Sequence, residues 1–385
     1  MRVEFHNHID EIPVTAWNAL VVDNNPFLRH EFLAAMEHHN CVGETFGWLP
    51  HHIAVYGDDQ PDTLIGAMPL YEKYNSYGEF VFDHAWADAY QRSGLRYYPK
   101  LVSAVPYTPA MGQRLLAKPE NEKEIFSILI DAAIKLTQTM GLSSFHCLFP
   151  TPEQHQFLES SNLSTPLMTR HDCQFHWHNQ NYRDFDQFLE RLTPKKRKNI
   201  RQQRRRVNES GVTIRELDGL SATAEDWHNF TRFYNRTFDE KSGMATFNEP
   251  FFREVAEKIP DQIVLMLADL DGEAIAGALS YRSDTTLYGR HWGCIEEIDM
   301  LHFELCYYQG IEYAIKHGLK NFEPGAQGEH KIARGFLPTL TRSSHWVADE
   351  RFQQPIRDHV AHEHTAVAEY IDELASSSPY KSPSF

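Results

Sequence analysis

The chain has 385 residues, a length at which one hydrophobic core usually gives way to two, so the sequence predicts two domains. Its apolar content of 42% is typical of a globular protein, and no run approaches the length of about 20 apolar residues that a membrane-spanning helix needs. The N-terminus lacks the apolar segment of a signal peptide, and the five cysteines are odd in number and widely spaced. These features favour a cytoplasmic protein with reduced thiols.

The first half of the chain alternates strand patterns with one long helix pattern. The predicted elements are a helix at 27–36, strands at 52–56 and 64–70, a helix at 122–140, and strands at 144–149 and 173–178. Residues 71–109 are rich in aromatic side chains with interleaved glycines and prolines, and match neither pattern. Those aromatics either line a groove or pack between layers. We place the first domain at residues 1–181.

The second half contains more regular patterns. The predicted elements are a short helix at 185–192, a basic helix from Pro194 to about Gly211, a strand at 212–217, helices at 227–238 and 249–258, strands at 263–270, 274–280 and 286–292, a helix at 301–317, a strand at 320–323 and a terminal helix at 357–374. Asp271-Gly272 between two of these strands is a strong hairpin signal. We place the second domain at 182–375 and expect a disordered tail at 376–385.

Net charge is −16, which argues against a protein that coats nucleic acid generally. The stretch 195–206 nevertheless carries eight basic residues and no acidic one, which suggests a specific anionic partner. The candidate polyanion-binding residues are Lys195, Lys196, Arg197, Arg201, Arg204 and Arg205. A solvated helix face that pairs with the acidic body is an equally good interpretation. No base-reading module accompanies the helix, so we expect no DNA binding.

The most unusual stretch is NFEPGAQGEHKIARGFLP, at 321–338, where two glycines precede a dense group of polar side chains. That group combines an acid, an imidazole, an amine and a guanidinium: Glu329, His330, Lys331 and Arg334. We expect Glu329 and His330 to handle protons in catalysis, and Lys331 and Arg334, with Glu323, to bind substrate. The alternative is a network of salt bridges that only orders the loop.

Three further candidates end the strand at 286–292: Arg290, His291 and Trp292. We take His291 as a second candidate base, and Arg290 and Trp292 as substrate-binding, although a histidine at a strand end is more often structural. Histidines at His359, His362 and His364 lack cysteine or carboxylate partners at zinc-binding spacing, so we expect no metal.

The order hairpin, strand, helix, strand resembles the core of the GNAT acyltransferases, and two such units resemble the Fem family, which builds peptidoglycan cross-bridges. The most specific likeness is HFELCYYQGIEYAIKHGLKNFEPGA followed by Lys331-x-x-Arg334-Gly335-Phe336, which is similar to the Fem C-terminal signature. The runs NPFLRHEFLAAME, YYPKLVSAVPYTP and GRHWGC look like Fem-like "peptidoglycan biosynthesis/recognition" proteins. The likeness covers most of the chain.

This resemblance implies an α/β fold of two tandem GNAT-like domains, each a mixed, mainly antiparallel sheet flanked by helices. It implies an N-acyltransferase that moves an acyl or aminoacyl group to an amine acceptor, a peptidoglycan precursor or another peptide-like molecule. No tightly bound cofactor is expected, and the donor is either aminoacyl-tRNA or acyl-CoA.

The donor segment departs from the GNAT pattern. GNAT enzymes that use acetyl-CoA carry a glycine-rich loop whose backbone amides hold the pyrophosphate. The corresponding residues 294–303 read CIEEIDMLHF, without glycine and with three acids. Their carboxylates disfavour CoA and favour aminoacyl-tRNA, for which the basic helix would supply phosphate contacts. Two alternatives stay open: a CoA-dependent acetyltransferase with an atypical loop, and a non-catalytic GNAT-fold protein that recognises a peptide-like or cell-wall ligand.

Overall fold

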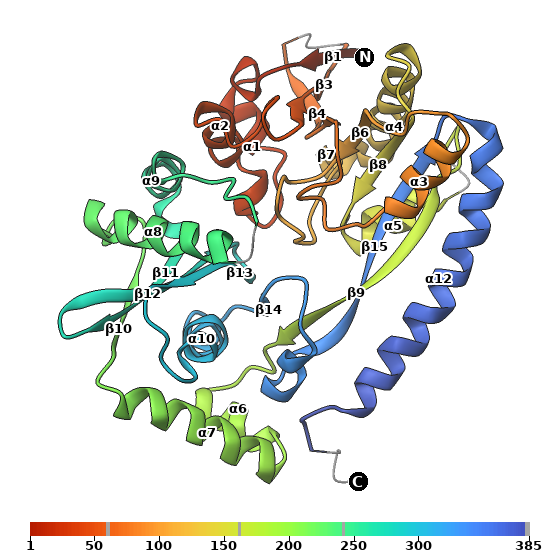
Figure 1. Cartoon of the computed structure of the whole chain (residues 1–385). Coiled ribbons are helices and arrows are strands. Elements are labelled where there is room, and N and C mark those ends of the chain that lie inside the picture. Colours follow the sequence, from red (N-terminus) through yellow and green to blue (C-terminus); the bar gives the residue numbers. More distant parts are fainter. Residues whose placement is uncertain (59–61, 161–162, 241–242, 382–385) are drawn as a thin grey trace. The chain divides into compact units, whose positions relative to one another are not determined.

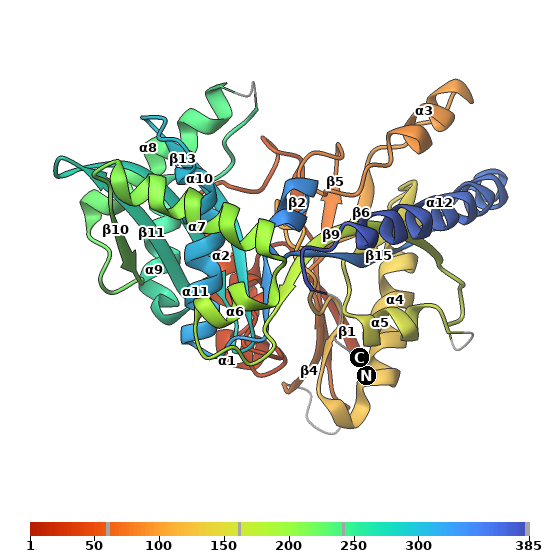
Figure 2. The ribbon, with the colours of Figure 1, turned by 90° about the horizontal axis from the view of Figure 1, so that it is seen from below.

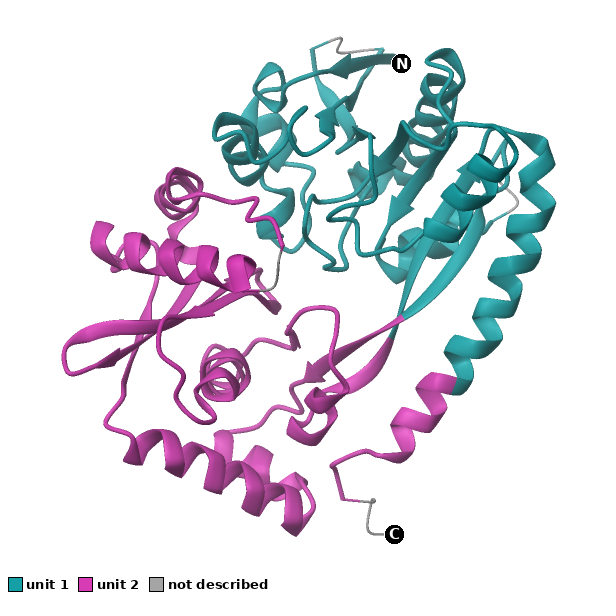
Figure 3. Cartoon of the chain, in the orientation of Figure 1, with its two compact units in different colours: residues 1–172, 340–369 teal, residues 173–339, 370–385 magenta. Residues whose placement is uncertain are grey.

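The computed structural model describes residues 1–58, 62–160, 163–240 and 243–381. The chain folds into two compact units, which Figure 3 colours separately. Unit 1 comprises Met1–Asp172 and Leu340–Glu369, and unit 2 comprises Cys173–Thr339 and Tyr370–Phe385. The chain passes from one unit to the other within two strands and one helix: β9 (Met168–His178), β15 (Leu337–Val347) and α12 (Glu350–Ser376).

These units differ from the predicted domains 1–181 and 182–375 in their connectivity. Residues 340–369, predicted in the second domain, belong to unit 1 because most of β15 and α12 packs there. The tail at 376–385, predicted to be disordered, also differs from the structure, because its described residues form hydrogen bonds. The Thr193 amide donates to the Pro379 carbonyl at 2.9 Å, and the Tyr380 hydroxyl donates to the Gly335 carbonyl at 2.7 Å. Residues 376–381 therefore pack on unit 2, and 382–385 lie outside the described residues.

Unit 2 is built on a mixed sheet with the strand order β10–β11–β12–β13–β14–β9 (Figure 1). Besides β9, its strands are β10 (Thr213–Leu217), β11 (Ile263–Leu270), β12 (Glu273–Arg282), β13 (Thr286–Cys294) and β14 (Asn321–Glu323). All neighbours are antiparallel except β13 and β14, which are parallel. The predicted hairpin joins β11 to β12: Asp271 and Gly272 both have positive φ, at 52° and 85°, as a two-residue turn of this type requires.

Helices cover both faces of this sheet (Figure 1, Figure 2). They are α6 (Phe185–Arg191), α7 (Pro194–Glu209), α8 (Ala224–Glu240), α9 (Glu249–Lys258), α10 (Leu301–Phe303), a π-helical turn η5 (Glu304–Tyr308), α11 (Gln309–Lys316) and the 3-10 helix η6 (Glu329–Arg334). Helix α8 packs so tightly on β13 that a Cβ at Gly293 would lie 2.0 Å from the Phe233 carbonyl oxygen. Helix α11 approaches β14 as closely, since a Cβ at Gly310 would lie 2.5 Å from the Phe322 ring.

Unit 1 contains a four-stranded antiparallel sheet, in the order β1–β3–β4–β7, and a second set of strands in the order β15–β8–β6–β5–β2. Their bounds are β1 (Arg2–His6), β2 (Trp48–Pro50), β3 (His52–Tyr56), β4 (Leu64–Met68), β5 (Tyr71–Lys73), β6 (Lys100–Ser103), β7 (Leu116–Ala117) and β8 (Ser144–Leu148). Strands β6 and β8 are parallel, so this set is mixed and mainly antiparallel as well. The predicted strands at 52–56, 64–70 and 144–149 are confirmed.

The helices of unit 1 are α1 (Val14–Asn18), α2 (His30–His38), α3 (His84–Arg92), α4 (Glu122–Thr139), α5 (Pro152–Leu158) and α12. Helix α4 buries the apolar stripe predicted for it, with Ile125, Leu129 and Ala133 fully enclosed. Each large aliphatic side chain buried this way stabilises the fold by about 1.5–3 kcal/mol. The aromatic stretch 71–109 contains β5, α3 and β6, which the sequence pattern missed. Half of its ten aromatic residues are buried, and Trp86, Tyr90 and Tyr97 among them share one core cluster, so packing between layers accounts for that half.

Candidate functional site

The candidate site of unit 2 lies where the parallel pair of β13 and β14 ends. The two strands pair only over Thr286–Tyr288 and Asn321–Glu323. Pro324 follows β14 directly, and because proline has no backbone N–H it cannot extend the ladder. The chain then passes through Gly325 and Gly328, at φ 92° and 113°, into η6. These glycines permit the sharp turn that delivers the side chains of η6 next to the end of β14.

The strand β13 is itself distorted at this level. Leu279 pairs with His291 while the next residue, Ser280, pairs with Gly289, so Arg290 is the extra residue of a β-bulge. Burial lowers the pKa of Arg290 to about 10, and the Glu323 carboxylate opposes that shift by attracting the guanidinium. Bulges redirect side chains beside functional sites. Two predicted substrate-binding residues, Arg290 and Glu323, therefore lie close enough to interact.

His330 is the exposed imidazole of the cluster. Its Nε2 lies 2.9 Å from the hydroxyl of Tyr307, a residue of η5. Burial, together with the positive charges of Arg334 and Lys331, lowers the pKa of His330 below its ordinary value. The ring is therefore neutral at pH 7 and able to accept a proton, as a general base must.

Lys331 is the neighbour of His330 but is buried, with 2% exposure. Its Nζ donates to the Gly325 carbonyl at 2.7 Å, and it forms no ion pair within the described residues. Burial lowers its pKa to about 8, and the nearby Arg290 guanidinium adds to the shift. A buried amine without a carboxylate partner is costly to the fold, and such groups concentrate at functional sites.

Arg334 is buried too, and its guanidinium carbon lies 3.5 Å from the centre of the Phe303 ring. Nη1 donates to the His330 carbonyl at 2.7 Å, which fixes the guanidinium against η6. Its buried Nε has no hydrogen-bond partner within the described part of the chain. One donor of a rigid, permanently charged group is thus left for an anionic atom of a ligand.

Glu329 lies on the exposed side of η6, where its Oε1 accepts from the Tyr370 hydroxyl at 2.7 Å. The three polar residues at the start of η6 therefore differ in environment: Glu329 and His330 face solvent and Lys331 faces the interior.

The two remaining candidates on β13, His291 and Trp292, point to opposite faces of the sheet because successive side chains of a strand alternate. The His291 ring contacts Tyr234, Phe247 and Phe252 on the α8–α9 face, with ring centres 5.1–6.0 Å apart. Burial lowers its pKa to about 3, so His291 is a very weak base. Trp292 points to the opposite face, where it meets His302 at 5.2 Å, and His302 in turn meets Tyr307 at 5.6 Å. The structure thus brings Trp292 toward the Tyr307–His330 pair and leaves His291 among aromatic side chains of the other face.

The sequence patterns did not indicate Phe303 and Tyr307, which lie against His330 and Arg334. The π-helical turn η5 inserts one extra residue per turn, and such turns frequently occur at functional sites. A helical pattern of period 3.6 does not reveal this turn, although the density of aromatics in HFELCYY could have drawn attention to it.

The basic residues of α7 fall into two groups. Arg204 is engaged inside the fold, because Nη2 lies 2.8 Å from Glu304 and 2.7 Å from Glu312. Arg201 and Arg205 make only exposed ion pairs, with Asp186 at 2.9 Å and Glu209 at 3.7 Å. Lys195, Lys196, Arg197 and Lys198 form no ion pair with any described residue. Arg197, Lys198, Arg201 and Arg205 line an open hollow of about 540 Å³.

The segment before α10 carries the three acids noted in the sequence. Glu296, Glu297 and Asp299 are all exposed, and Asp299 pairs with Arg206 at 2.9 Å. Met300 precedes α10 in a left-handed conformation, with φ 67°. Among the described residues no group of three or more histidines, cysteines and carboxylates could hold a metal ion. Nor is any described helix both long and apolar enough to cross a membrane.

Several solved structures share this fold. FemX superposes with a TM-score of 0.53 at 13% identity, over 93% of this chain and 100% of that one. An Agrobacterium fabrum domain described as the C-terminal domain of a lysylphosphatidylglycerol synthetase gives 0.54 at 8% identity, over 92% and 95%. A conserved protein of unknown function from Bacteroides thetaiotaomicron gives 0.51 at 10% identity, over 90% and 100%. The predicted α/β fold of two units, each with a mixed sheet flanked by helices, is confirmed.

The sequence itself identifies the family. The chain belongs to the FemAB-like family, described as peptidoglycan biosynthesis/recognition, whose model matches residues 8–382. No protein of curated function matches the chain. The predicted family is thereby confirmed.

Proposed function

We propose that this protein is an N-acyltransferase that moves an aminoacyl group from aminoacyl-tRNA to the amine of a peptide-like acceptor, such as a peptidoglycan precursor. The observation that carries the proposal is the pair of buried cations on η6. Lys331 has no carboxylate partner among the described residues, and the buried Nε of Arg334 has no hydrogen-bond partner there. Fixed positive charge of this kind stabilises the oxyanion that develops during acyl transfer.

Direct attack then needs one base and no covalent enzyme intermediate. The acceptor nitrogen attacks the carbonyl carbon of the aminoacyl ester, and its excess proton passes to the neutral imidazole of His330. Lys331 and Arg334 stabilise the negative charge on the carbonyl oxygen. When the tetrahedral intermediate collapses, the ester C–O bond breaks and the ribose oxygen leaves with a proton. Glu329, on the exposed side of η6, accepts a hydrogen bond from the neutral acceptor amine and orients it for attack, and the proton that His330 takes up is the one that leaves with the ribose oxygen.

The choice of donor rests on charge. Three exposed carboxylates at 296–299 would repel the pyrophosphate of CoA at the place where GNAT enzymes bind it. The first turn of α7 holds Lys195, Lys196 and Arg197, where the helix dipole already disfavours positive charge. A bound phosphate backbone would relieve that repulsion and release counterions, so binding should weaken steeply with salt.

The test uses the full chain with radiolabelled aminoacyl-tRNA and UDP-N-acetylmuramoyl pentapeptide as the acceptor. We expect label to appear in the pentapeptide, and His330→Asn to lower the rate about 10²-fold or more, the range typical of a lost general base. His228→Asn removes an exposed histidine of α8 and should leave the rate unchanged. Lys195→Gln with Lys196→Gln should weaken tRNA binding and flatten its salt dependence, whereas Lys258→Gln on α9 should do neither.

Two results would overturn the proposal. Transfer from labelled acetyl-CoA, with none from tRNA, would make the protein a CoA-dependent acetyltransferase. Tight pentapeptide binding with no transfer from either donor would make it a recognition protein on an acyltransferase fold.

A further inference from the structure

The hydroxyl of Tyr307 and Nε2 of His330 lie 2.9 Å apart and share one hydrogen bond, which has two possible directions. In the first, Tyr307 donates to the lone pair of Nε2, and the proton of the neutral ring lies on Nδ1. In the second, Nε2 donates to the tyrosine oxygen, and Nδ1 is free to accept. The direction decides through which nitrogen His330 acts as a base.

The surroundings of Tyr307 favour the first direction. Tyr307 is 4% exposed, and within the described part of the chain its hydroxyl has no hydrogen-bond acceptor other than His330. If Nε2 donated to the tyrosine oxygen, the hydroxyl proton would be buried without an acceptor, which costs stability. Donation from Tyr307 to Nε2 satisfies both groups. The proton of the neutral His330 ring therefore lies on Nδ1.

The position of the imidazole depends on a glycine and two aromatic rings. The ring lies against Gly328, where an added Cβ would come within 2.5 Å of Cε1 and 2.9 Å of Nδ1. The rings of Phe303 and Tyr307 also lie against it, each with its centre 5.8 Å from that of His330. His330 is an exposed residue, and its Nδ1 has no hydrogen-bond partner among the described residues. That nitrogen is therefore available to a ligand.

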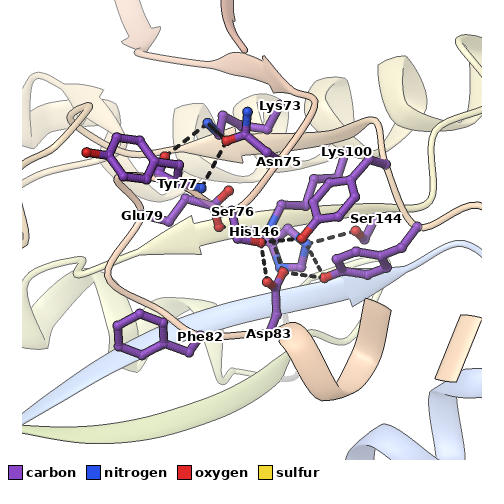
Figure 4. A network of polar contacts seen from close by, with 12 residues as sticks. Lys73, Asn75, Ser76, Tyr77, Glu79, Phe82, Asp83, Lys100, Ser144 and His146 are labelled. Atoms are coloured by element: carbon purple, nitrogen blue, oxygen red, sulfur yellow. Dashed lines mark hydrogen bonds and ion pairs between the residues drawn. The ribbon is translucent and has the colours of Figure 1, made fainter. Parts of the chain in front are cut away.

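His146 of unit 1 is the contrasting, buried case (Figure 4). Its Nε2 lies 2.8 Å from the Ser144 hydroxyl and 3.3 Å from the Tyr97 hydroxyl, and its Nδ1 lies 2.6 Å from Nδ1 of His345. Both nitrogens of His146 are thus bonded inside the fold, and the residue is 1% exposed. In His330 only Nε2 is bonded internally, which is what a histidine that exchanges protons with a ligand requires.

The Tyr307 hydroxyl stands between an incoming proton and the nitrogen that can accept it. The lone pair of neutral His330 is on Nε2, and Tyr307 already donates to it. Burial raises the pKa of Tyr307 above its ordinary value, so the tyrosine passes its proton on only while it receives another. A proton from the acceptor amine therefore reaches Nε2 by two linked transfers, from the amine to the tyrosine oxygen and from the tyrosine to Nε2.

We propose that Tyr307 is a catalytic residue that passes the proton of the acceptor amine to Nε2 of His330. This inference rests on the proposed acyl transfer. As the amine nitrogen bonds to the ester carbonyl carbon, its proton moves to the Tyr307 oxygen and the Tyr307 proton moves to Nε2. When the ester C–O bond breaks, the imidazolium gives its Nδ1 proton to the ribose oxygen. His330 ends neutral with its proton on Nε2, and exchange with water restores the first tautomer.

The placement of the ring proton can be measured without substrate. Nitrogen NMR shifts distinguish the protonated from the unprotonated nitrogen of a neutral imidazole, in the full chain with isotopically labelled histidine. The signals missing from His330→Asn should show a proton on Nδ1, and Tyr307→Phe should move it to Nε2 at least in part. Tyr370→Phe, which removes the hydroxyl that bonds to the neighbouring Glu329, should leave it on Nδ1. A proton on Nε2 in the unaltered protein would overturn the proposal.

The rate of transfer from labelled aminoacyl-tRNA to the pentapeptide tests the relay. Tyr307→Phe should lower kcat about 10²-fold and leave the KM of the pentapeptide within about twofold. Because the two residues act in one transfer, Tyr307→Phe combined with His330→Asn should be no slower than the slower single variant. Tyr313→Phe is the matched control, a tyrosine of α11 whose ring stacks on His317, and should leave the rate unchanged.

Two kinetic results would contradict the relay while leaving acyl transfer intact. An undiminished rate in Tyr307→Phe would mean that the amine reaches Nε2 directly. Additive losses in the double variant would mean that Tyr307 and His330 act separately. If the unaltered protein transfers nothing, the acyl-transfer proposal fails and the relay fails with it, whereas the NMR measurement still decides where His330 carries its proton.

Discussion

Unit 1 buries Lys73 and Lys100, and unit 2 buries Lys331. The pKa values of Lys100 and Lys331 shift in opposite directions. Lys100 of unit 1 is 0% exposed and lies 2.7 Å from Glu79 and 2.5 Å from Asp83. Burial alone would lower its pKa, yet these two carboxylates outweigh it and raise the pKa above the ordinary value. Lys331 of unit 2 is 2% exposed and bonds only to a backbone carbonyl, and its pKa falls to about 8.

The charge of Lys100 is compensated within the fold, whereas the charge of Lys331 remains available to a ligand. Burying an ammonium costs several kcal/mol unless ionic and hydrogen-bond partners compensate. Around Lys100 two carboxylates compensate, and the network has no positive charge left to offer a ligand. Around Lys331 the compensation is incomplete, so an anion or a developing oxyanion would improve its environment. We therefore expect substitutions of the two lysines to affect different properties.

The largest expected effect is on the stability of unit 1. Lys100→Met removes the cation and leaves the Asp83 and Glu79 carboxylates buried without their partner. Breaking a buried ion pair in this way costs about 3–5 kcal/mol of unfolding free energy. Urea titration followed by circular dichroism measures the loss. Lys331→Met should cost less than about 1 kcal/mol, because it replaces a poorly compensated charge with an apolar chain. Equal losses would remove the distinction between the two lysines.

The second effect concerns the turn that holds Lys331 and Arg334. Gly335 ends η6 at φ 99°, and a Cβ there would lie 2.8 Å from the Phe188 ring. Gly335→Ala combines backbone strain with a clash and should cost about 2–3 kcal/mol. Gly318→Ala, at φ 67° with no atom within 4 Å of the added Cβ, is the matched control and should cost only about 1 kcal/mol. A similar cost for both would show that Phe188 moves aside freely.

The third effect is a pH dependence of the unfolding free energy that Lys331 causes. Its pKa is 10.5 when unfolded and about 8 when folded, so between these values the unfolded chain binds the proton that the folded chain has released. Stability therefore rises with pH across this window, by up to about 1.4 kcal/mol per pH unit. Below pH 8 the lysine is charged in both states and its unfavourable contribution is constant.

The measurement is the difference in unfolding free energy between the unaltered protein and Lys331→Met at several pH values from 7 to 10. We expect the difference to be flat near pH 7 and to rise in favour of the unaltered protein above pH 8. Lys258→Met, which removes an exposed lysine of α9, should show no such rise. A flat line for Lys331→Met would mean that the amine keeps its charge in the fold.

Sequence patterns revealed unit 2 more completely than unit 1, for physical reasons. The Asp271-Gly272 turn and the apolar periodicities of 263–282 are local signals, and the structure contains the hairpin they predict. In 71–109 the strands β5 and β6 have only three and four residues, and α3 lies between them, so no periodic pattern is long enough to detect. The contribution of 340–369 to unit 1 depends on contacts between residues far apart in the sequence, which a local pattern does not contain.

For the candidate site, the sequence indicated the polar residues of η6 but not their burial. Glu329, His330, Lys331 and Arg334 are four ionisable groups in one short stretch, and only the fold shows that two of them face the interior. The π-helical turn that places Tyr307 beside His330 leaves no signature in residue spacing. The same holds for Arg204, whose neighbours in the basic helix give no hint of its pairing with Glu304 and Glu312.

The smallest expected effect extends the comparison from buried lysines to the exposed cations of α7. Arg201 is 55% exposed and pairs with Asp186, which is 73% exposed. Such a pair is screened by water and salt, so Arg201→Ala should change the unfolding free energy by less than about 0.5 kcal/mol. Arg204→Ala leaves Glu304 buried without its guanidinium and should cost several times more, as urea titration of both variants will measure. If Arg201→Ala destabilises the fold as much as Arg204→Ala does, the exposed face of α7 is needed for folding. The proposal that it binds a polyanion would then lose its physical basis.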